Sequence, residues 1–353
     1  MARHKILVTG ASGFIGARLV RQLVESGEQV KAMVRASSSL KYLQDLPESQ
    51  LEIVEGDVTV GHTVYRSLAG CDRLFHVAAL TKFWDRNKGA VEAAAVVGTT
   101  EVFEAARRRK IERVVFTSSV AALGRTYQQE EMDETHEFNI PDADEYVSGK
   151  EKAEHIALAH QKDFEVVAVL PASVFGPGDW KPTPGGKGIL QYLTWNVPLF
   201  DFPAPAGGIN VVDVDDVVSG HMAAMEKGKS GERYVLGGDN LTYTQMFTIL
   251  SEITGLPGPA ADPITSGVAE TLGRVLELRA MLTGQEPEVT FRSARDFVNK
   301  YSWVSSAKAE RELGYRHRTA RRALARSVQW YLENGYVEQK TARRIRVDLR
   351  APA

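Results

Sequence analysis

Short apolar runs alternate with longer amphipathic segments from residue 5 to about residue 170. The apolar runs are typical of buried strands, and the segments between them repeat their apolar positions at helical spacing. Strands that are apolar throughout and separated by helices predict a parallel sheet covered on both faces. The pattern therefore predicts an α/β, doubly wound fold. The expected strands are 5–9, 29–34, 51–55, 73–77, 113–117 and 164–170, and the expected helices are 14–25, 38–46, 60–69, 89–109 and 145–161.

The pattern changes after residue 170. Residues 171–208 are rich in proline and glycine, which predicts loops, and long loops inside compact domains are usually functional. A strand at 209–212, a helix at 216–226 and a further strand at 232–236 follow, and the chain from residue 242 is mainly helical. We expect a first domain at 1–172, with its sheet completed by about 209–226 and 232–236. Residues 173–208 and 237–353 would form a smaller, mostly helical C-terminal lobe.

Three glycines stand between the first strand and the first helix. Gly10, Gly13 and Gly16 permit a tight turn, a close approach of the backbone to a pyrophosphate, and close packing of helix on sheet. The helix N-terminus adds N–H groups and a positive potential. The spacing predicts a Rossmann dinucleotide site. Its loop residues are Gly10, Ser12, Gly13, Phe14, Ile15 and Gly16.

The end of the second strand bears on the choice of nucleotide. Sites that prefer NAD place a carboxylate there for the ribose 2′-hydroxyl, whereas this strand ends in Val34 and Arg35. A guanidinium can pair bidentately with a 2′-phosphate, and Lys41 could add a donor. We therefore predict NADP(H) as the cofactor. The alternative is that Arg35 is an ordinary surface residue.

Asp57 and Val58 follow the third strand. A carboxylate in this place can accept a hydrogen bond from the adenine amino group, and both residues are predicted to contact the cofactor. The alternative for Asp57 is that it caps the N-terminus of the next helix.

Tyr146 and Lys150 are one turn apart on an expected helix, so their side chains share a face. A nearby ammonium lowers the pKa of a phenol from about 10, which favours proton transfer, and it can also hold the nicotinamide ribose. Two serines end the fifth strand, at the sheet edge where ligands bind. We predict Ser119, rather than Ser118, as the donor that orients a substrate carbonyl.

These features together resemble the extended short-chain dehydrogenase/reductase superfamily. The chain is most similar to its dihydroflavonol-4-reductase-like and 3β-hydroxysteroid-dehydrogenase-like members, and also to hopanoid-associated sugar epimerase-like proteins. The similar segments include VTGASGFIG, RVVFTSS, YVSGKEKAE and LPASVFGPGD. The resemblance implies Ser119, Tyr146 and Lys150 as the catalytic set, and a homodimer formed through helices 89–109 and 145–161. It also implies cofactor contacts from Val77, Ala78, Ala79, Pro171 and Val174.

Several positions depart from the pattern of the superfamily. Gly149 replaces a serine, Leu170 an arginine and Asp213 a histidine, while Ala95 stands where nucleotide-sugar epimerases commonly carry asparagine. Ala95 and Val34 favour a reductase of ketones or aldehydes, or the reverse alcohol dehydrogenase, with Tyr146 as general acid or base. The alternatives are a nucleotide-sugar epimerase or dehydratase that retains NAD, and a non-catalytic NADP(H)-binding sensor.

Aromatic residues gather near the expected substrate end of the site. They favour a small cyclic or aromatic carbonyl substrate, although each could instead pack the lobe. Lys181 is the one cation that the sequence places there for an anionic group. The predicted pocket residues are Phe83, Trp84, Trp180, Tyr192 and Trp195.

Composition limits the partners, the metals and the cellular compartment that we expect for the chain. A net charge of −2 gives no overall attraction to nucleic acid or to an anionic membrane, and Cys71, as the only cysteine, excludes an intrachain disulfide. No apolar stretch approaches the ~20 residues of a membrane span. The eight histidines show no zinc-ligand spacing, so no metal is expected. We expect a cytoplasmic protein, in which 269–282 is an amphipathic helix packed on the domain or, alternatively, a lid or a membrane-surface contact.

Overall fold

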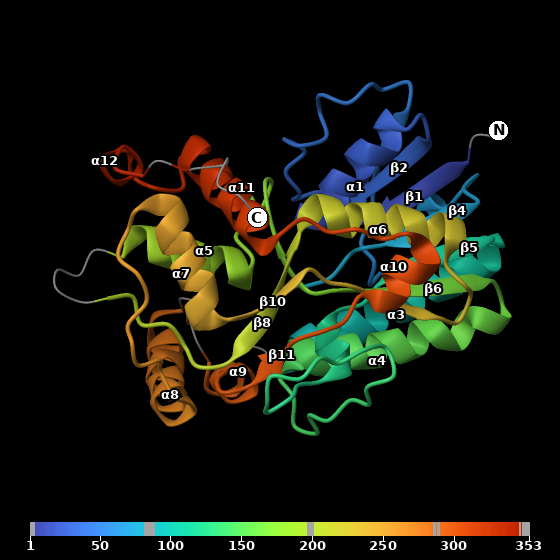
Figure 1. The fold of residues 1–353 in the computed structure, drawn as a ribbon. Coiled ribbons are helices and arrows are strands. Elements are labelled where there is room, and N and C mark those ends of the chain that lie inside the picture. Colours follow the sequence, from blue (N-terminus) through green and yellow to red (C-terminus); the bar gives the residue numbers. More distant parts are fainter. Residues whose placement is uncertain are drawn as a thin grey trace.

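Parallel strands form the central sheet of the computed structural model, which describes residues 4–80, 89–195, 201–284, 287, 290–345 and 347 (Figure 1). The described strands of this sheet number seven, in the order β3-β2-β1-β4-β5-β6-β9, and every neighbouring pair is parallel. The order reverses at β1, as in doubly wound folds. The predicted fold class is confirmed. The strands are β1 (Lys5–Thr9), β2 (Gln29–Val34), β3 (Leu51–Glu55), β4 (Arg73–His76), β5 (Arg113–Thr117), β6 (Glu165–Pro171) and β9 (Arg233–Leu236).

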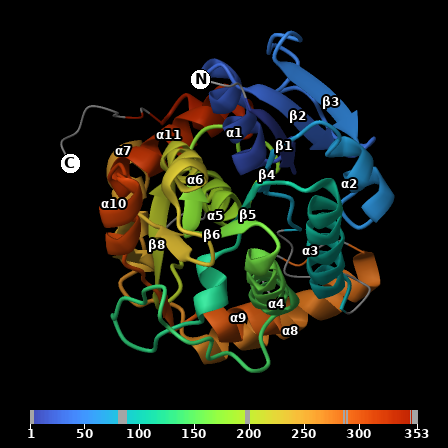
Figure 2. The ribbon, with the colours of Figure 1, turned by 90° about the vertical axis from the view of Figure 1, so that its right-hand side faces the viewer.

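Helices cover both faces of this sheet (Figure 2). Since successive residues of a strand point to opposite faces, Ile6 and Val8 pack into one core and Leu7 into the other. The first core includes residues of α1 (Phe14–Glu25) and α6 (Val214–Lys227). The second includes residues of α2 (Gly61–Ser67), α3 (Ala90–Arg109) and α4 (Glu145–Ala159).

The prediction of a helix at 38–46 is wrong. These residues form turns, in which the amides of Leu43 and Gln44 both donate to the carbonyl of Leu40. The hydroxyls of Ser38 and Ser39 accept from nearby backbone amides, of Arg35 and of Lys41. Such local side-chain bonds compete with the helical ladder, so the apolar spacing of this segment does not produce a helix.

A second, smaller sheet is built around β8 (Gly208–Asp213). It pairs in parallel with β7 (Ser173–Phe175) and β11 (Tyr301–Ser302), and antiparallel with β10 (Asp239–Thr242). The expectation that a strand at 209–212 completes the main sheet is therefore wrong, because that strand belongs to the second sheet. The helix after it, α6, does cover the main sheet, and β9 does extend it.

The C-terminal part is mainly helical, as predicted, and has an apolar core of its own. One helix departs from this lobe: α10 packs against α6 and β9. The helices are α5 (Pro184–Thr194), α7 (Tyr243–Thr254), α8 (Ser266–Thr283), α9 (Phe291–Phe297), α10 (Ala307–Leu313), α11 (Ala320–Glu333) and α12 (Gln339–Ala342).

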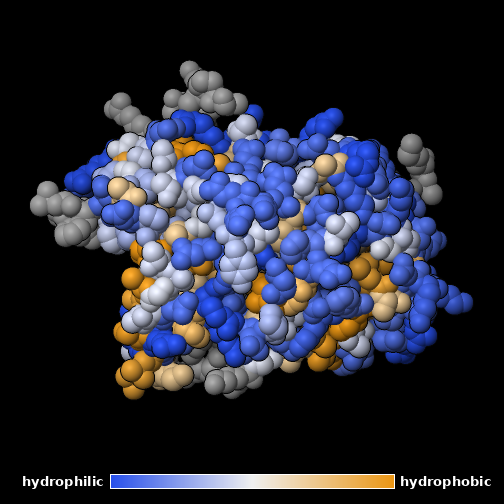
Figure 3. Space-filling view, turned by 60° about the horizontal axis from the view of Figure 1, so that its bottom comes forward, coloured by the Kyte–Doolittle hydropathy of each residue, from blue (hydrophilic) through white to orange (hydrophobic). Residues whose placement is uncertain are grey.

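Helix α8 packs on α9 through small residues, with Ala269, Gly273 and Ala280 buried. Its large apolar side chains face outward, and apolar surface gathers over this helix (Figure 3). The exposed side chains are Val268, Leu272, Val275, Leu278, Met281 and Leu282. In the described part of the chain, none of the helices combines the length and apolar character that crossing a bilayer requires.

Candidate active site

The glycine-rich loop joins β1 to α1 at the point where the strand order reverses. Gly10 has φ +67°, and a Cβ on it would lie 2.7 Å from the backbone of Ala78. A Cβ on Gly16 would lie 2.1 Å from the carbonyl oxygen of Gly10. Neither position has room for a side chain. The loop is thus a backbone cradle at the N-terminus of α1, and it fits the pyrophosphate of a dinucleotide.

Trp180 lies against this loop rather than in a separate substrate pocket. Its indole nitrogen donates a 3.0 Å hydrogen bond to the carbonyl of Ser12, and its ring lies 6.5 Å from that of Tyr42. The hydroxyl of Tyr336 donates to the carbonyl of Trp180 at 2.6 Å. The proline- and glycine-rich segment therefore covers the edge of the predicted cofactor site. Lys181 lies 4.8 Å from the Trp180 ring centroid.

Arg35 follows β2 and Asp57 follows the neighbouring strand β3, on the same edge of the sheet as the loop. The carboxylate of Asp57 accepts from the amide and the hydroxyl of Thr59, at 2.9 Å and 2.7 Å. These bonds lower the pKa of Asp57, and the charge of Arg35 adds to the effect. The N-cap of α2 is Val60, not Asp57, so the capping alternative is wrong. Arg35 is exposed, and Lys41 lies 5.5 Å from the Tyr42 ring centroid.

The remaining predicted cofactor residues lie at the carboxyl ends of the strands or beside the loop. Ile15, Val77 and Val174 pack against one apolar core, which is also the core that α1 covers. Pro171 is buried at the end of β6, and Ala79 is exposed after β4. Val58 packs against the opposite core, and a Cβ on Gly98 would lie 3.1 Å from it.

Helix α4 brings the Tyr146 and Lys150 side chains to the end of β5. Asp144 caps this helix by accepting from the Tyr146 amide at 3.0 Å. Tyr146 and Ser119 form a side-chain hydrogen bond. The Lys150 ammonium is buried and donates to the carbonyl of Thr117 at 2.9 Å. The structure thus brings the three predicted catalytic residues together.

Burial shifts the proton affinities of these groups. It raises the pKa of Tyr146, and the Ser119 hydrogen bond and the charge of Arg125 act in the opposite direction. Burial lowers the pKa of Lys150 to about 8, against the raising effect of Glu154. Arg125 is a neighbour of the phenol that sequence reasoning missed. The sequence signal for Arg125 was its place six residues after Ser119, in the segment that follows β5.

Two buried histidines support the ends of β4 and β5. The Nδ1–H of His221 donates to the carbonyl of Val217 at 2.8 Å, so its Nε2 accepts from the Thr117 hydroxyl at 2.9 Å. His76 contacts the hydroxyl of Thr9 at 2.8 Å. Burial, with the charge of Lys150, lowers the pKa of His76 to about 3, and burial lowers that of His221 to about 4. Both are neutral structural groups at physiological pH.

Ala95 and Gly149, two of the departures from the superfamily pattern, face each other. A Cβ on Gly149 would lie 3.2 Å from the Cβ of Ala95, at the packing of α3 on α4. A side chain at position 149 would press on α3. Ala95 and Gly149 together therefore allow the close packing of α3 on α4, the helix that carries Tyr146 and Lys150.

The predicted substrate aromatics do not form a single pocket. Phe83 and Trp84 lie outside the described residues. Tyr192 is 2% exposed, and its hydroxyl donates to the carbonyl of Pro257 at 3.0 Å. Trp195 packs on Phe202, with ring centroids 5.6 Å apart. The structure places Tyr192 in the core of the lobe, so its assignment to the substrate pocket is wrong. Trp195 is half-buried against that core, and its place in the pocket stays a prediction.

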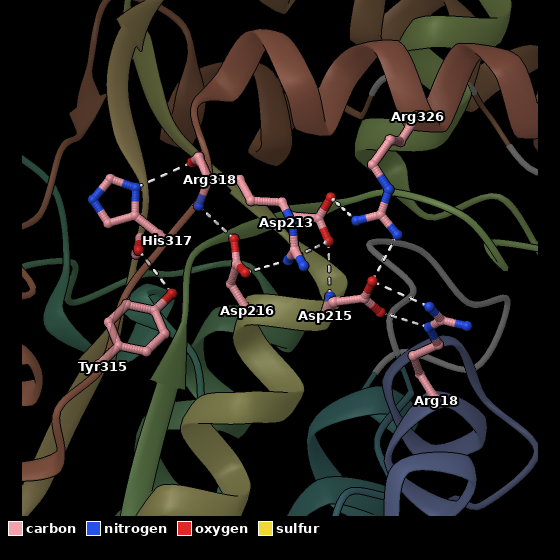
Figure 4. Close-up of polar contacts among 9 residues, drawn as sticks. Arg18, Asp213, Asp215, Asp216, Tyr315, His317, Arg318 and Arg326 are labelled. Atoms are coloured by element: carbon pink, nitrogen blue, oxygen red, sulfur yellow. Dashed lines mark hydrogen bonds and ion pairs between the residues drawn. The ribbon is translucent and has the colours of Figure 1, made fainter. Parts of the chain in front are cut away.

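Three aspartates at the start of α6 link the lobe to the nucleotide-binding part (Figure 4). Asp215 accepts from Arg18 of α1 at 2.6 Å and 3.1 Å, and from Arg326 of α11 at 2.6 Å. Asp213 caps α6 and also accepts from Arg326 at 2.6 Å. Asp216 pairs with Arg318. Burial raises the pKa of Asp215, but the two guanidinium groups outweigh burial and lower it.

Known proteins match most of the chain. Residues 6–237 match the sequence profile of the NAD dependent epimerase/dehydratase family. A protein of Synechocystis sp. named as a dihydroflavonol 4-reductase is 36% identical over 94% of this chain and 95% of its own. Sterol demethylase protein B of Methylococcus capsulatus is 33% identical over 94% of this chain and 99% of its own.

Solved structures share the fold. The crystal structure of gox2253 has a TM-score of 0.81 and 34% identity, and the match covers 95% of this chain and 100% of that one. Nucleotide-sugar epimerases share the fold at identities below 25%.

Proposed function

Because the chain belongs to the NAD dependent epimerase/dehydratase family, which is part of the extended short-chain dehydrogenase/reductases, we propose that it is an NADP(H)-dependent reductase of ketones or aldehydes. One observation carries the proposal. The Tyr146 hydroxyl is hydrogen-bonded to Ser119 and lies one helical turn from the buried Lys150, and all three residues lie at the sheet edge that holds the glycine-rich loop. Relatives named as reductases support an oxidoreductase.

Each residue of the set has a chemical role. Bound NADPH supplies the hydride. Ser119 donates a hydrogen bond to the substrate carbonyl oxygen, which stabilises negative charge as it develops. Tyr146 gives its hydroxyl proton to the same oxygen, and takes it back in the reverse reaction. Lys150 favours the phenolate through its charge and holds the hydroxyls of the nicotinamide ribose.

The preference for NADP(H) rests on Arg35 and on the absence of a carboxylate at Val34. Arg35 is exposed at the end of β2 and can pair with a 2′-phosphate. Asp57, just after the neighbouring strand β3, is proposed to accept a hydrogen bond from the adenine amino group. We propose residues 1–172 as the core of the NADP-binding domain and the C-terminal lobe as the part that binds substrate.

Net reduction is favoured over epimerisation. An epimerase returns the hydride to the same substrate and keeps its NAD, whereas an exchangeable NADPH suits a reductase. Ala95, which packs on Gly149, leaves no amide where epimerases commonly carry asparagine. A nucleotide-sugar epimerase or dehydratase is the second candidate, favoured by the shared fold of the sugar epimerases.

NADPH oxidation against a panel of cyclic and aryl ketones tests the proposal. We expect turnover in the wild type, and a loss of roughly 10²–10⁴-fold in kcat for Tyr146→Phe with unchanged NADPH affinity. Unchanged turnover in Tyr146→Phe would overturn the catalytic assignment. A purified protein that carries tightly held NAD and acts without added cofactor would support the epimerase, and cofactor binding with no turnover of any substrate would support a sensor.

A further inference from the structure

A cavity of about 290 Å³ lies beside the segment that follows β5 and Ser119. One wall comes from residues 125–142, which follow β5 in the chain, and the other from α9 and the residues just after it. The charged groups that line it are Arg125, Asp142, Arg295, Asp296 and Lys300. Cations therefore outnumber carboxylates in its wall.

Arg125 is the most deeply buried cation in this wall. Its side chain is 4% exposed, and the guanidinium lies 4.6 Å from the centroid of the Phe297 ring. Nη1 donates to the carbonyl of Gly124 at 2.6 Å. Nε has no hydrogen-bond partner among the described residues. A buried guanidinium without a paired carboxylate destabilises a folded protein, so an anionic ligand bound to Arg125 would offset that cost.

The nearest carboxylate does not fill that role. Asp296 influences Arg125 through its charge, but both of its oxygens have other donors. One accepts from the Asp144 amide at 3.0 Å, and the other from Nε of Arg295 at 2.9 Å. Asp296 therefore organises the cavity wall and leaves Nε of Arg125 without a partner.

The cavity adjoins Tyr146, because this tyrosine and the lining residue Ile140 pack against the same small apolar cluster, and Lys300 is a further cation in its wall. The charge of Arg125 acts on Tyr146 and opposes the rise that burial causes in its pKa. Lys300, on the opposite wall, is half-buried, and its ammonium donates to the carbonyl of Arg295. An anionic group held by Arg125 and Lys300 would belong to a molecule that also reaches Tyr146.

We propose that this cavity binds a carboxylate of the substrate, so that the enzyme reduces oxo acids anchored by Arg125 and assisted by Lys300. The planar edge formed by Nε and an Nη of Arg125 matches the two oxygens of a carboxylate. Lys181, which the sequence offered as the cation for an anionic group, lies over Trp180 instead. The proposal rests on the proposed reductase function and adds its substrate class.

Matched acids and esters test it. Wild type and Arg125→Met are compared on 3-oxo-3-phenylpropanoate, 4-oxo-4-phenylbutanoate and 5-oxo-5-phenylpentanoate, each beside its methyl ester. We expect Arg125→Met to raise KM for the preferred acid about 10-fold or more and to leave KM for its ester within about 2-fold. Arg125→Lys should be intermediate, because it keeps the charge but loses the fork. Arg322→Met, an exposed change on α11, is the matched control.

An unchanged ratio of kcat/KM between acid and ester in Arg125→Met would overturn the carboxylate site. If that variant does not fold, as judged by NADPH binding and thermal melting, Lys300→Met replaces it, with an expected KM increase of about 3-fold for the acid alone. An unchanged KM there would count against the proposal equally.

Calorimetry with 4-phenylbutanoate, which has no carbonyl to reduce, separates the two proposals. Binding to the wild-type NADP⁺ complex that Arg125→Met loses would support the carboxylate site even if no ketone is reduced. Ketone reduction by the wild type, with equal binding of 4-phenylbutanoate to both proteins, would overturn the carboxylate site and leave the reductase standing.

Discussion

The indole of Trp180 donates to the main-chain oxygen of Ser12 at 3.0 Å, which attaches the proline- and glycine-rich segment to the glycine-rich loop. The two residues are far apart in the sequence, and the bond fixes one side of the predicted pyrophosphate cradle.

Trp180→Phe should therefore weaken NADPH binding without abolishing it. Loss of one hydrogen bond worth about 0.5–1.5 kcal/mol corresponds to a roughly 2–10-fold higher Kd, measured by fluorescence titration. Trp303 offers a matched control, because its indole donates to the carbonyl of Leu241 at 3.0 Å in the second sheet. Equal effects of Trp180→Phe and Trp303→Phe on Kd would contradict a local role for Trp180.

Arg35→Ala should change the choice of cofactor. Charge-assisted hydrogen bonds contribute about 1.5–3 kcal/mol, so KM for NADPH should rise roughly 10–100-fold while KM for NADH stays nearly constant. Steady-state kinetics with both cofactors measures the ratio. A parallel rise for NADH would show that Arg35 does not recognise the 2′-phosphate, and Lys41→Ala provides a smaller change for comparison.

Asp215→Asn should destabilise the fold at the junction of α1, α6 and α11. The substitution keeps the size of the side chain but leaves Arg18 and Arg326 facing a neutral amide, at an expected cost of about 1.5–3 kcal/mol in the free energy of unfolding. Urea unfolding at pH 7.5 measures this. Glu104→Gln breaks the exposed pair with Arg107 and should leave the midpoint unchanged. A similarly unchanged midpoint for Asp215→Asn would show that the network adds no stability.

His221 should make stability fall in acid. Its pKa is lowered to about 4 in the fold from 6.5. The unfolded chain therefore binds more protons between these values, and stability is lost as the pH falls through this range. From pH 7.5 to 5.0 this one group accounts for a loss of about 2 kcal/mol.

His221→Gln tests this through the slope rather than the absolute stability. The variant should lose about 2 kcal/mol less than the wild type between the two pH values, measured by urea unfolding. The exposed His155→Gln should keep the wild-type slope. If His221→Gln also keeps it, the buried imidazole does not set the acid sensitivity; His76 would then be the next group to examine.

The sequence predicts the features that depend on local spacing. The glycines of the loop act within one turn of each other, and Tyr146 and Lys150 share a helix, so their arrangement follows from their separation in the chain. The main-sheet strands are predicted well for a similar reason, since strands buried on both faces are apolar throughout.

Features that depend on distant partners were not predictable. Arg125 becomes a buried cation because Phe297 and Asp296 arrive from α9, more than 150 residues later. Tyr192 stands in a stretch rich in loop-forming residues, and only the packing of α5 shows that its side chain lies in the core of the lobe. The segment 38–46 has helical spacing, but the hydroxyls of Ser38 and Ser39 accept hydrogen bonds from the backbone amides of Arg35 and Lys41.

The last strand of the main sheet gives the chain an order of assembly. Strand β6 ends at Pro171, but its outer neighbour β9 ends at Leu236, and α6 is made between them. During synthesis, a nascent chain that stops short of residue 236 therefore exposes a row of unpaired backbone groups along β6, which is a template for pairing with other chains. The main sheet is therefore complete only after residues 173–208 of the lobe have been synthesised, so the nucleotide-binding part and the lobe fold together.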